Sequence, residues 1–323
     1  MPDKSIQSVK TEAFSFDVVK TSDGLNVIVA EGSVGFGDFP LSSYLDESLV
    51  SSVTEVSLPA SFSNLSYQDF TGLNSLATIN VSPDNPSYAS VGGVLFDKEM
   101  TTLIRCPVGK EDTSYNVPDT VSKIESRAFA NCGNLTDINM SENVTEVGVH
   151  AFTNTGCYND KNNWENGVLY VGSCAAASKE PPSSVEIKDG TTTIGNGAFF
   201  GQPIEKVTIP DSVISVGEGA FAFCSELREV AGGDGVEFVG NDAFLQCSDD
   251  IAVVPAEQSN YEINNNPEPD FDAGSQDPDY NDPDFTSLNS VMQSREEEPD
   301  SREDNVEVEK SNINWEDPWD GEH

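Results

Sequence analysis

The stretch IPDSVISVGEGAFAFCSELREV, residues 209–230, contains the pattern that decides the fold, because the chain repeats its spacing. Similar stretches lie on both sides of it: VPDTVSKIESRAFANCGNLTDINM from Val117, SENVTEVGVHAFTNTGC from Ser141, VEIKDGTTTIGNGAFFGQPIEKVTI from Val185 and VEFVGNDAFLQC from Val236. A fainter copy, VTEVSLPASFSNLSYQDFTGLNSLATINV, begins at Val53. An internal repeat therefore organises most of the chain, and it has to be recognised before any single motif is interpreted.

One phenylalanine marks the same place in every copy. We call these residues the anchors, and they are Phe70, Phe129, Phe152, Phe199, Phe221 and Phe244. Phe129 and Phe152 are 23 residues apart, the last three anchors follow one another at 22 and 23, and the 47 residues from Phe152 to Phe199 equal two periods plus one. A period of 22 to 23 residues lies in the range of roughly 20 to 29 that is typical of leucine-rich repeats. The sequence therefore predicts a β-rich solenoid, a leucine-rich repeat array with parallel strands.

Each unit has the same expected course. Alternating runs such as Leu135-x-x-Ile138-x-Met140 and Ile204-x-x-Val207-x-Ile209 have the period of strands with one buried face, and they should stack as a parallel sheet. A proline, Pro118 or Pro210, ends the strand, and an apolar pair such as Val213 and Val216 returns to the core. The glycine that follows, which we expect to permit a tight bend, is Gly148, Gly195, Gly217 or Gly240. The Ala-Phe pair then points inward, ring upon ring between neighbouring units.

Composition and pattern divide the chain into three parts. We expect residues 1–50 to form a hairpin cap that turns at Ser22-Asp23-Gly24, and residues 51–255 to form the solenoid. Insertions at 85–107 and 162–174 share a Gly-Val-Leu-aromatic core, which predicts β-hairpins that leave the solenoid. Residues 256–323 contain 21 acidic and 3 basic side chains with few branched apolar residues, which is typical of a disordered acidic tail.

The charge balance excludes several classes of partner. The chain has 56 Asp and Glu against 16 Lys and Arg, for a formal charge of -40, so nucleic acid and anionic membranes are repelled. No stretch approaches the roughly 18 to 20 apolar residues of a membrane span, so membrane insertion is not expected. The first residues, MPDKSIQSVKTEAFSFDVV, lack an apolar signal region, which leaves a cytoplasmic location possible.

Reactive side chains do not form a catalytic or metal-binding pattern. Cys132, Cys224 and Cys247 lie three residues after an anchor, where a small buried side chain suits a tight inner turn. Disulfide pairing stays open for the cysteines in or beside the insertions, Cys106, Cys157 and Cys174. With no CxxC pair we expect no metal site and no cofactor.

Histidine is scarce, and serine or cysteine nucleophiles normally need a histidine base. Of the two histidines, His323 is the last residue. His150 occupies a repeat position that holds Arg127, Gly197, Gly219 or Asp242 elsewhere, a mixture that indicates an exposed site without a common role. We therefore predict a protein that is not an enzyme.

The repeat pattern, with Asn-Pro-x-Tyr, Gly-Val-Leu-Phe and Leu-Ile-x-Cys-Pro in the first insertion, closely resembles the BspA-type leucine-rich repeat family over about Val53 to Val254. The resemblance implies a solenoid found largely in surface and secreted proteins of bacteria and some parasitic protists. It also implies attachment to host proteins or to other cells, and hence an extracellular or cell-surface location.

Two functions follow as hypotheses. In the first, a monomeric solenoid binds a protein ligand through the outward positions of its stacked strands, a ladder made of Thr136, Asp137, Asn139, Glu205, Lys206, Thr208, Arg228 and Glu229. In the alternative, the chain is an intracellular interaction scaffold whose acidic tail is the binding element, with Trp315 and Trp319 as a short docking motif.

Overall fold

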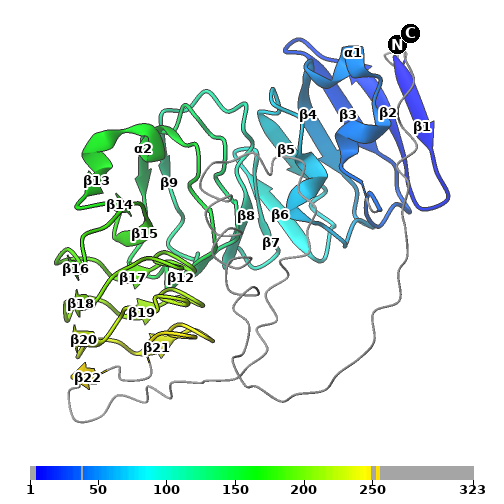
Figure 1. The fold of residues 1–323 in the computed structure, drawn as a ribbon. Coiled ribbons are helices and arrows are strands. Elements are labelled where there is room, and N and C mark those ends of the chain that lie inside the picture. The colour runs from blue at the N-terminus through cyan, green and yellow to red at the C-terminus, as the bar shows by residue number, and fades with distance from the viewer. Residues whose placement is uncertain (1–4, 38, 249–251, 255–323) are drawn as a thin grey trace, which may run out of the picture. The chain divides into compact units, whose positions relative to one another are not determined.

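The computed structural model describes residues 5–37, 39–248 and 252–254. The chain divides into two units, Met1–Phe271 and Asp272–His323, and all the described residues belong to the first (Figure 1). The predicted disordered tail, residues 256–323, lies outside the described residues.

The first part of the chain forms a five-stranded sheet with its own core. Three antiparallel strands come first, β1 (Gln7–Lys10), β2 (Ser15–Lys20) and β3 (Leu25–Val29), and β2 turns into β3 through the Ser22-Asp23-Gly24 segment. Parallel pairing begins with the next two strands, β4 (Val53–Leu58) and β5 (Thr78–Val81). Short helices lie between the strands: η1 (Leu41–Tyr44), α1 (Glu47–Val50) and η2 (Tyr67–Phe70). The sheet changes from antiparallel to parallel at β3, where the repeats begin.

Both insertions form hairpins, but they do not leave the solenoid as the sequence led us to expect. The first contains β6 (Tyr88–Val91), β7 (Val94–Asp97) and β8 (Thr102–Arg105), and the second contains β13 (Trp164–Glu165), β14 (Val168–Val171) and β15 (Cys174–Ser178). The first insertion ends with β8, and the second reaches β15 only at Cys174. β8 pairs in parallel with β10, and β15 pairs in parallel with β17, so both hairpins continue directly into a rung of the solenoid.

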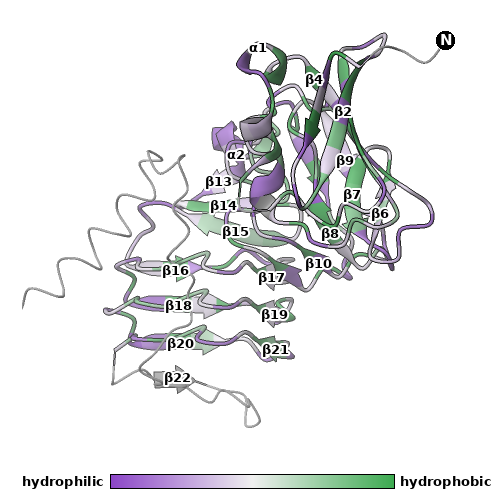
Figure 2. Cartoon of the chain, turned by 90° about the vertical axis from the view of Figure 1, so that its right-hand side faces the viewer, coloured by the Kyte–Doolittle hydropathy of each residue, from purple (hydrophilic) through white to green (hydrophobic). Residues whose placement is uncertain are grey.

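The repeats form two columns of parallel strands (Figures 1 and 2). One column has two-residue strands: β10 (Lys123–Ile124), β12 (Glu146–Val147), β17 (Thr193–Ile194), β19 (Ser215–Val216) and β21 (Phe238–Val239). The other has longer strands: β9 (Ser114–Asn116), β11 (Asp137–Asn139), β16 (Ser184–Glu186), β18 (Lys206–Ile209), β20 (Glu229–Gly232) and β22 (Ala252–Val254). Each turn of chain contributes one strand to each column, except the turn of β12, which has no long strand, and this is the predicted parallel array.

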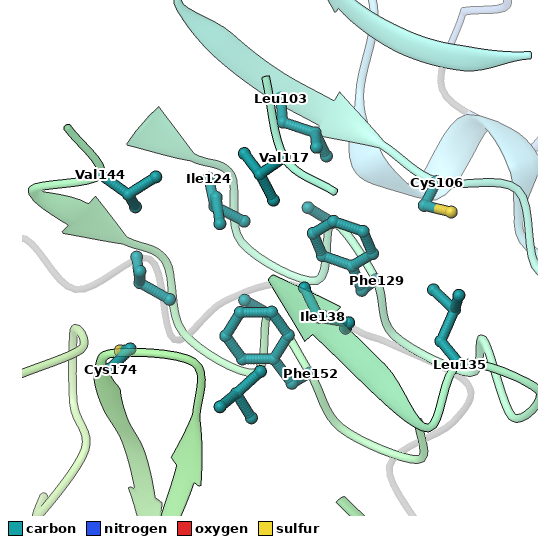
Figure 3. Close-up of a cluster of buried hydrophobic side chains, with 14 of the residues drawn as sticks. Leu103, Cys106, Val117, Ile124, Phe129, Leu135, Ile138, Val144, Phe152 and Cys174 are labelled. Atoms are coloured by element: carbon teal, nitrogen blue, oxygen red, sulfur yellow. The ribbon is translucent and has the colours of Figure 1, made fainter. Parts of the chain in front are cut away.

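The anchor rings are buried between the columns. The Phe199 and Phe221 rings stack with centroids 5.0 Å apart, and Phe221 and Phe244 follow at 5.3 Å. Phe129 and Phe152 form a second stack at 5.7 Å, surrounded by branched apolar side chains (Figure 3). The stacks belong to different core clusters, so the expected column of rings is divided in two. Phe70 belongs to the N-terminal cluster.

Each turn around the five anchors from Phe129 to Phe244 contains two residues with left-handed backbone. The residue two before the anchor has a φ near +60°, and so has the residue two after it; they are Arg127, Asn131, His150, Asn154, Gly197, Gly201, Gly219, Phe223, Asp242 and Gln246. The bend therefore does not depend on the four glycines predicted to form it, none of which has a positive φ. That prediction was wrong in its reason: Gly217 is needed because an added Cβ would lie 2.6 Å from the backbone nitrogen of Asn196 in the preceding coil.

Removal of one anchor ring tests the stack. Phe221 is fully buried between two rings, so we expect Phe221→Ala to lower the free energy of unfolding by about 3–5 kcal/mol. Phe244 is 8% exposed, so Phe244→Ala should cost less. Urea denaturation of both variants measures the difference, and a cost for Phe221→Ala equal to or below that of Phe244→Ala would contradict the packing.

Two glycines at the same repeat position provide a matched comparison. A Cβ on Gly217 meets backbone at 2.6 Å, whereas a Cβ on Gly195 has its nearest neighbour, the Ala176 carbonyl oxygen, at an ordinary 3.5 Å. We expect Gly217→Ala to destabilise the fold by about 1–3 kcal/mol through overpacking. Gly195→Ala should be neutral or stabilising by about 0.4–1 kcal/mol, because alanine restricts the unfolded chain. Thermal denaturation distinguishes them, and equal effects would sink the close-approach explanation.

Candidate functional site

The polar residues of the longer strands form one candidate surface. Along β18, Val207 and Ile209 are buried while Lys206 and Thr208 point outward, and β16 and β20 alternate in the same way. The parallel register puts Ser184, Lys206 and Glu229 in one row and Glu186, Thr208 and Ala231 in the next. We call this surface the C-terminal strand face; it consists of Ser184, Glu186, Lys206, Thr208, Glu229 and Ala231.

Two of the predicted residues lie just before these strands. Glu205 and Arg228 are exposed, and the backbone N–H of Arg228 donates to the Glu205 carbonyl at 2.9 Å. They stand in consecutive coils at the entry to β18 and β20, so they border the C-terminal strand face. Five of the eight predicted ladder residues therefore gather on or beside one sheet: Glu205, Lys206, Thr208, Arg228 and Glu229.

The other three predicted residues belong to a separate sheet. β11 pairs only with β9 in the described structure, and this two-stranded sheet presents Asp137 and Asn139 beside Ser114 and Asn116. The Asn139 side-chain amide donates to the Asn116 amide oxygen at 3.0 Å. The hydroxyl of Thr136, the residue before β11, donates to the Thr113 carbonyl at 3.2 Å. The eight residues predicted to form one ladder therefore lie on two separate polar faces.

The segment after Phe152 separates the two faces. In place of another long strand, the chain forms α2 (Gly156–Asn159) and η3 (Lys161–Asn163). The hydroxyl of buried Thr155 caps α2, accepting from the Tyr158 N–H at 3.0 Å, and the Cys157 N–H donates to the Leu135 carbonyl before β11 at 2.8 Å. The indole of Trp164 donates to the Tyr158 carbonyl at 2.8 Å, which fixes the start of the hairpin. The 47-residue anchor spacing was the sequence signal for this interruption.

Ion pairs run along the strand columns between coils. Lys206 Nζ and Glu229 Oε1 are 2.6 Å apart, with both side chains more than two fifths exposed. In the short-strand column Lys123 Nζ lies 2.9 Å from Glu146 and 3.4 Å from Glu125. Burial of Lys123 opposes its charge, but the two carboxylates outweigh that effect and raise its pKa. Exposed pairs of this kind fix side-chain pattern more than stability, since each contributes only about 0–1 kcal/mol.

Asp69 is the buried carboxylate whose surroundings resemble those of a catalytic acid. Burial raises its pKa to about 6, opposed by the hydrogen bond that its carboxylate accepts from the Ser66 N–H at 2.8 Å. Ser66 and Asp69 together form a capping box on η2, the helix that ends with the anchor Phe70. The interactions of Asp69 therefore account for it as a helix cap in the N-terminal core.

His150 is half-buried in the described structure, so the prediction of an exposed site without a common role needs correction. Its backbone φ of +57° is close to that of the equivalent residues in the other coils. These positions therefore share a left-handed backbone conformation, although their residue types differ. The ring Nδ1 lies 3.4 Å from the Thr153 hydroxyl.

The repeat cysteines make hydrogen bonds between coils. The thiols of Cys224 and Cys247 donate to the anchor carbonyls of the preceding coil, Phe199 at 3.0 Å and Phe221 at 3.2 Å. Cys132 makes the same contact with Cys106 at 3.5 Å, which identifies Cys106 as the residue in the anchor place of its coil. Sequence comparison missed this because the anchor there is not Phe.

All six cysteines are free thiols, and five of them are buried. Burial raises the pKa of Cys174 and of Cys247 to about 12, and raises that of Cys224 as well. These three thiols are therefore protonated at neutral pH, which suits a role in packing.

Within the part of the chain that the structure describes, no cluster of three or more His, Cys, Asp or Glu side chains has the arrangement of a metal site. No helix among these same residues has the length and apolar character needed to cross a bilayer.

The stacked coils and their outward polar strands define a repeat solenoid of the leucine-rich class, whose members serve as protein-interaction modules and are not known as enzymes. More specifically, the family model described as "BspA type Leucine rich repeat region" matches six copies over residues 48–175 and 155–267, so the chain belongs to that family. Proteins of this family are commonly located at cell surfaces or secreted.

Several solved structures are similar to this chain. A leucine-rich cell surface protein from Faecalibacterium prausnitzii is 26% identical, with 64% of this chain and 59% of that one covered and a TM-score of 0.38. A leucine-rich repeat protein from Eubacterium ventriosum is 18% identical over 70% and 53%, with a TM-score of 0.32. The pneumococcal vaccine antigen PcpA is 16% identical over 77% and 90%, also at 0.32.

The chain thus spans less than two thirds of the length of the first two structures. No curated protein matches it.

The ion pair between Lys206 and Glu229 allows a test of whether the C-terminal strand face contributes to the stability of the fold. Because Lys206 and Glu229 are both well exposed, the double swap Lys206→Glu with Glu229→Lys keeps the pair and should change the free energy of unfolding by less than about 1 kcal/mol. Urea denaturation measures this. A loss above about 2 kcal/mol would show that the pair is structural, and the face would then be a poor candidate for binding.

Proposed function

We propose that this protein binds a protein ligand through the C-terminal strand face, outside the cell or at its surface, as an adhesion or recognition module. The binding residues are Lys206, Thr208 and Glu229 on the strands, with Glu205 and Arg228 at their entry. Thr136, Asp137 and Asn139 on the separate β9–β11 sheet form a second polar face that the same ligand can contact only if it reaches across α2 and β13.

The observation that carries the proposal is the fixed alternation of the strands. Inward positions are fully buried, so the backbone holds the outward side chains in rows before any ligand arrives. A surface ordered by folding loses less conformational entropy on binding than a flexible loop, for which each immobilised side chain costs about 0.5–1.5 kcal/mol. The face therefore suits recognition by complementarity, without chemistry on the ligand.

The composition of the face favours a protein partner. Together with the bordering Glu205 and Arg228, it combines one lysine and one arginine with glutamates and hydroxyls. Such mixed donors and acceptors match the polar surface of a folded protein. The net charge of -40 disfavours nucleic acid and anionic lipid. Membership of a family commonly found at cell surfaces supports the extracellular location.

Charge reversal at three positions tests the proposal. Beads coated with the full chain are counted on wells coated with a basement-membrane extract and on wells coated with albumin. We expect Glu205→Lys, Lys206→Glu and Arg228→Glu together to reduce specific attachment at least roughly tenfold, since the loss of a few interface contacts removes a few kcal/mol. Unchanged attachment would exclude the C-terminal strand face.

Matched controls separate the competing explanations. Lys20→Glu with Asp23→Lys alters charge on the N-terminal hairpin and should leave attachment intact. The swap of Lys206 with Glu229 keeps stability and should still reduce attachment, because it inverts the pattern. Deletion of residues 256–323 should preserve attachment. Loss on deletion, with the triple variant still binding, would favour the acidic-tail scaffold instead.

A further inference from the structure

The last described coil presents an uncovered strand. β21 is the final member of its sheet, and its Phe238 and Val239 side chains are 56% and 40% exposed. In the preceding coil the residues opposite them, Ser215 and Val216, are only 5% and 1% exposed because β21 covers them. Two large apolar side chains on an open edge favour pairing with another strand.

The backbone of β21 also has acceptors ready for that strand. In successive coils the N–H groups of Ser215 and Gly217 donate to the carbonyls of Thr192 and Ile194, and those of Phe238 and Gly240 donate to Ile214 and Val216. One coil further, the equivalent acceptors are the carbonyls of Glu237 and Val239. The described residues provide no donor for these two carbonyls.

Paired residues in neighbouring coils are separated by a fixed number of residues in the sequence. For any two neighbouring coils, this number is the same for the long strands as for the short strands that follow them. It is 22 residues where Ser184 pairs with Lys206 and Thr193 with Ser215, and 23 where Lys206 pairs with Glu229 and Ser215 with Phe238. β22 pairs with β20 at an offset of 23, Ala231 with Val254. In the sequence, Tyr261 and Glu262 follow Phe238 and Val239 by the same 23 residues.

Two further observations point to this segment as the occupant. Pro255 directly follows β22, as Pro210 follows β18. The match to the family model continues to residue 267, past the boundary at 255 that composition predicts. A second copy of the chain is a poorer fit, since it would bring exposed Asp234 and Glu237 against another acidic surface.

We propose that residues 255–263 dock on the open end of the solenoid and add one more parallel strand, Tyr261–Glu262, to the edge of β21. Tyr261 covers Phe238, the Tyr261 and Ile263 N–H groups donate to the Glu237 and Val239 carbonyls, and Glu262 gives the terminal rung a polar side chain. The short connection from β22 keeps the segment at high effective concentration. This docking closes the apolar end without a partner protein.

Cross-linking in the full chain tests the register. Opposite residues of adjacent strands lie about 4.8 Å apart, within the range of roughly 4.4–6.8 Å that a disulfide requires. With oxidised glutathione as oxidant, Phe238→Cys plus Tyr261→Cys should close to a disulfide with release of two reduced glutathiones. The control pair, Phe238→Cys plus Thr286→Cys, should close at least roughly tenfold more slowly. Its longer tether alone accounts for about threefold, and docking of Tyr261 beside Phe238 accounts for the rest.

Hydrogen exchange provides a second readout that needs no cysteine. We expect the Tyr261 and Ile263 amides to exchange at least roughly tenfold more slowly in the full chain than in the Tyr261→Asp variant, at all protein concentrations. Equal cross-linking of the two cysteine pairs, or unprotected amides at 261 and 263, would overturn the proposal. So would protection that appears only on raising protein concentration, since that result assigns the open end to a second copy.

Discussion

The contact between one anchor and the next is the interaction on which the rest of the structure depends. Among the last three anchors, the Phe199 N–H donates to the Ala220 carbonyl and the Phe221 N–H donates to the Ala243 carbonyl, each at 2.7 Å. The rings of these anchors stack on one another. Backbone and ring therefore specify the same spacing between coils. Each coil packs only against the coils before and after it, so the same spacing recurs from one coil to the next.

That spacing explains features that otherwise look unrelated. Left-handed residues flank the five anchors from Phe129 to Phe244 because the chain has to bend sharply on both sides of each. Asparagine or glycine fills many of these places, since both tolerate a positive φ. Phe223 is an exception, an aromatic residue at φ +62° whose ring packs on Phe200 at 5.0 Å. The thiols of Cys224 and Cys247 join the same inter-coil network through the anchor carbonyls. The polar strand faces are formed by the outward side chains of the coils that this contact holds together.

Much of the fold could be predicted because the repeat leaves a periodic record in the sequence. The anchor spacing predicted the parallel array, and the buried anchors and alternating strands confirm it. The role of Cys106 could not be predicted, because a cysteine in an anchor place has no resemblance to phenylalanine and only its hydrogen bond to Cys132 reveals it. The third strands of the insertions were missed for a similar reason: β8 and β15 look like hairpin strands, and only their partners show that they are rungs.

The candidate site was predictable only in part. Alternation showed which side chains of β18 and β20 point outward, but not that α2 replaces a strand and separates Asp137 and Asn139 from them. That division depends on the local capping of α2 by Thr155, which no repeat comparison detects.

The central claim, that consecutive anchors touch, is tested most directly by proton–proton Overhauser contacts between selectively labelled phenylalanine rings. The account predicts contacts from Phe199 to Phe221 and from Phe221 to Phe244, and none from Phe199 to Phe244. Absence of the first two, or a contact between Phe199 and Phe244, would contradict it.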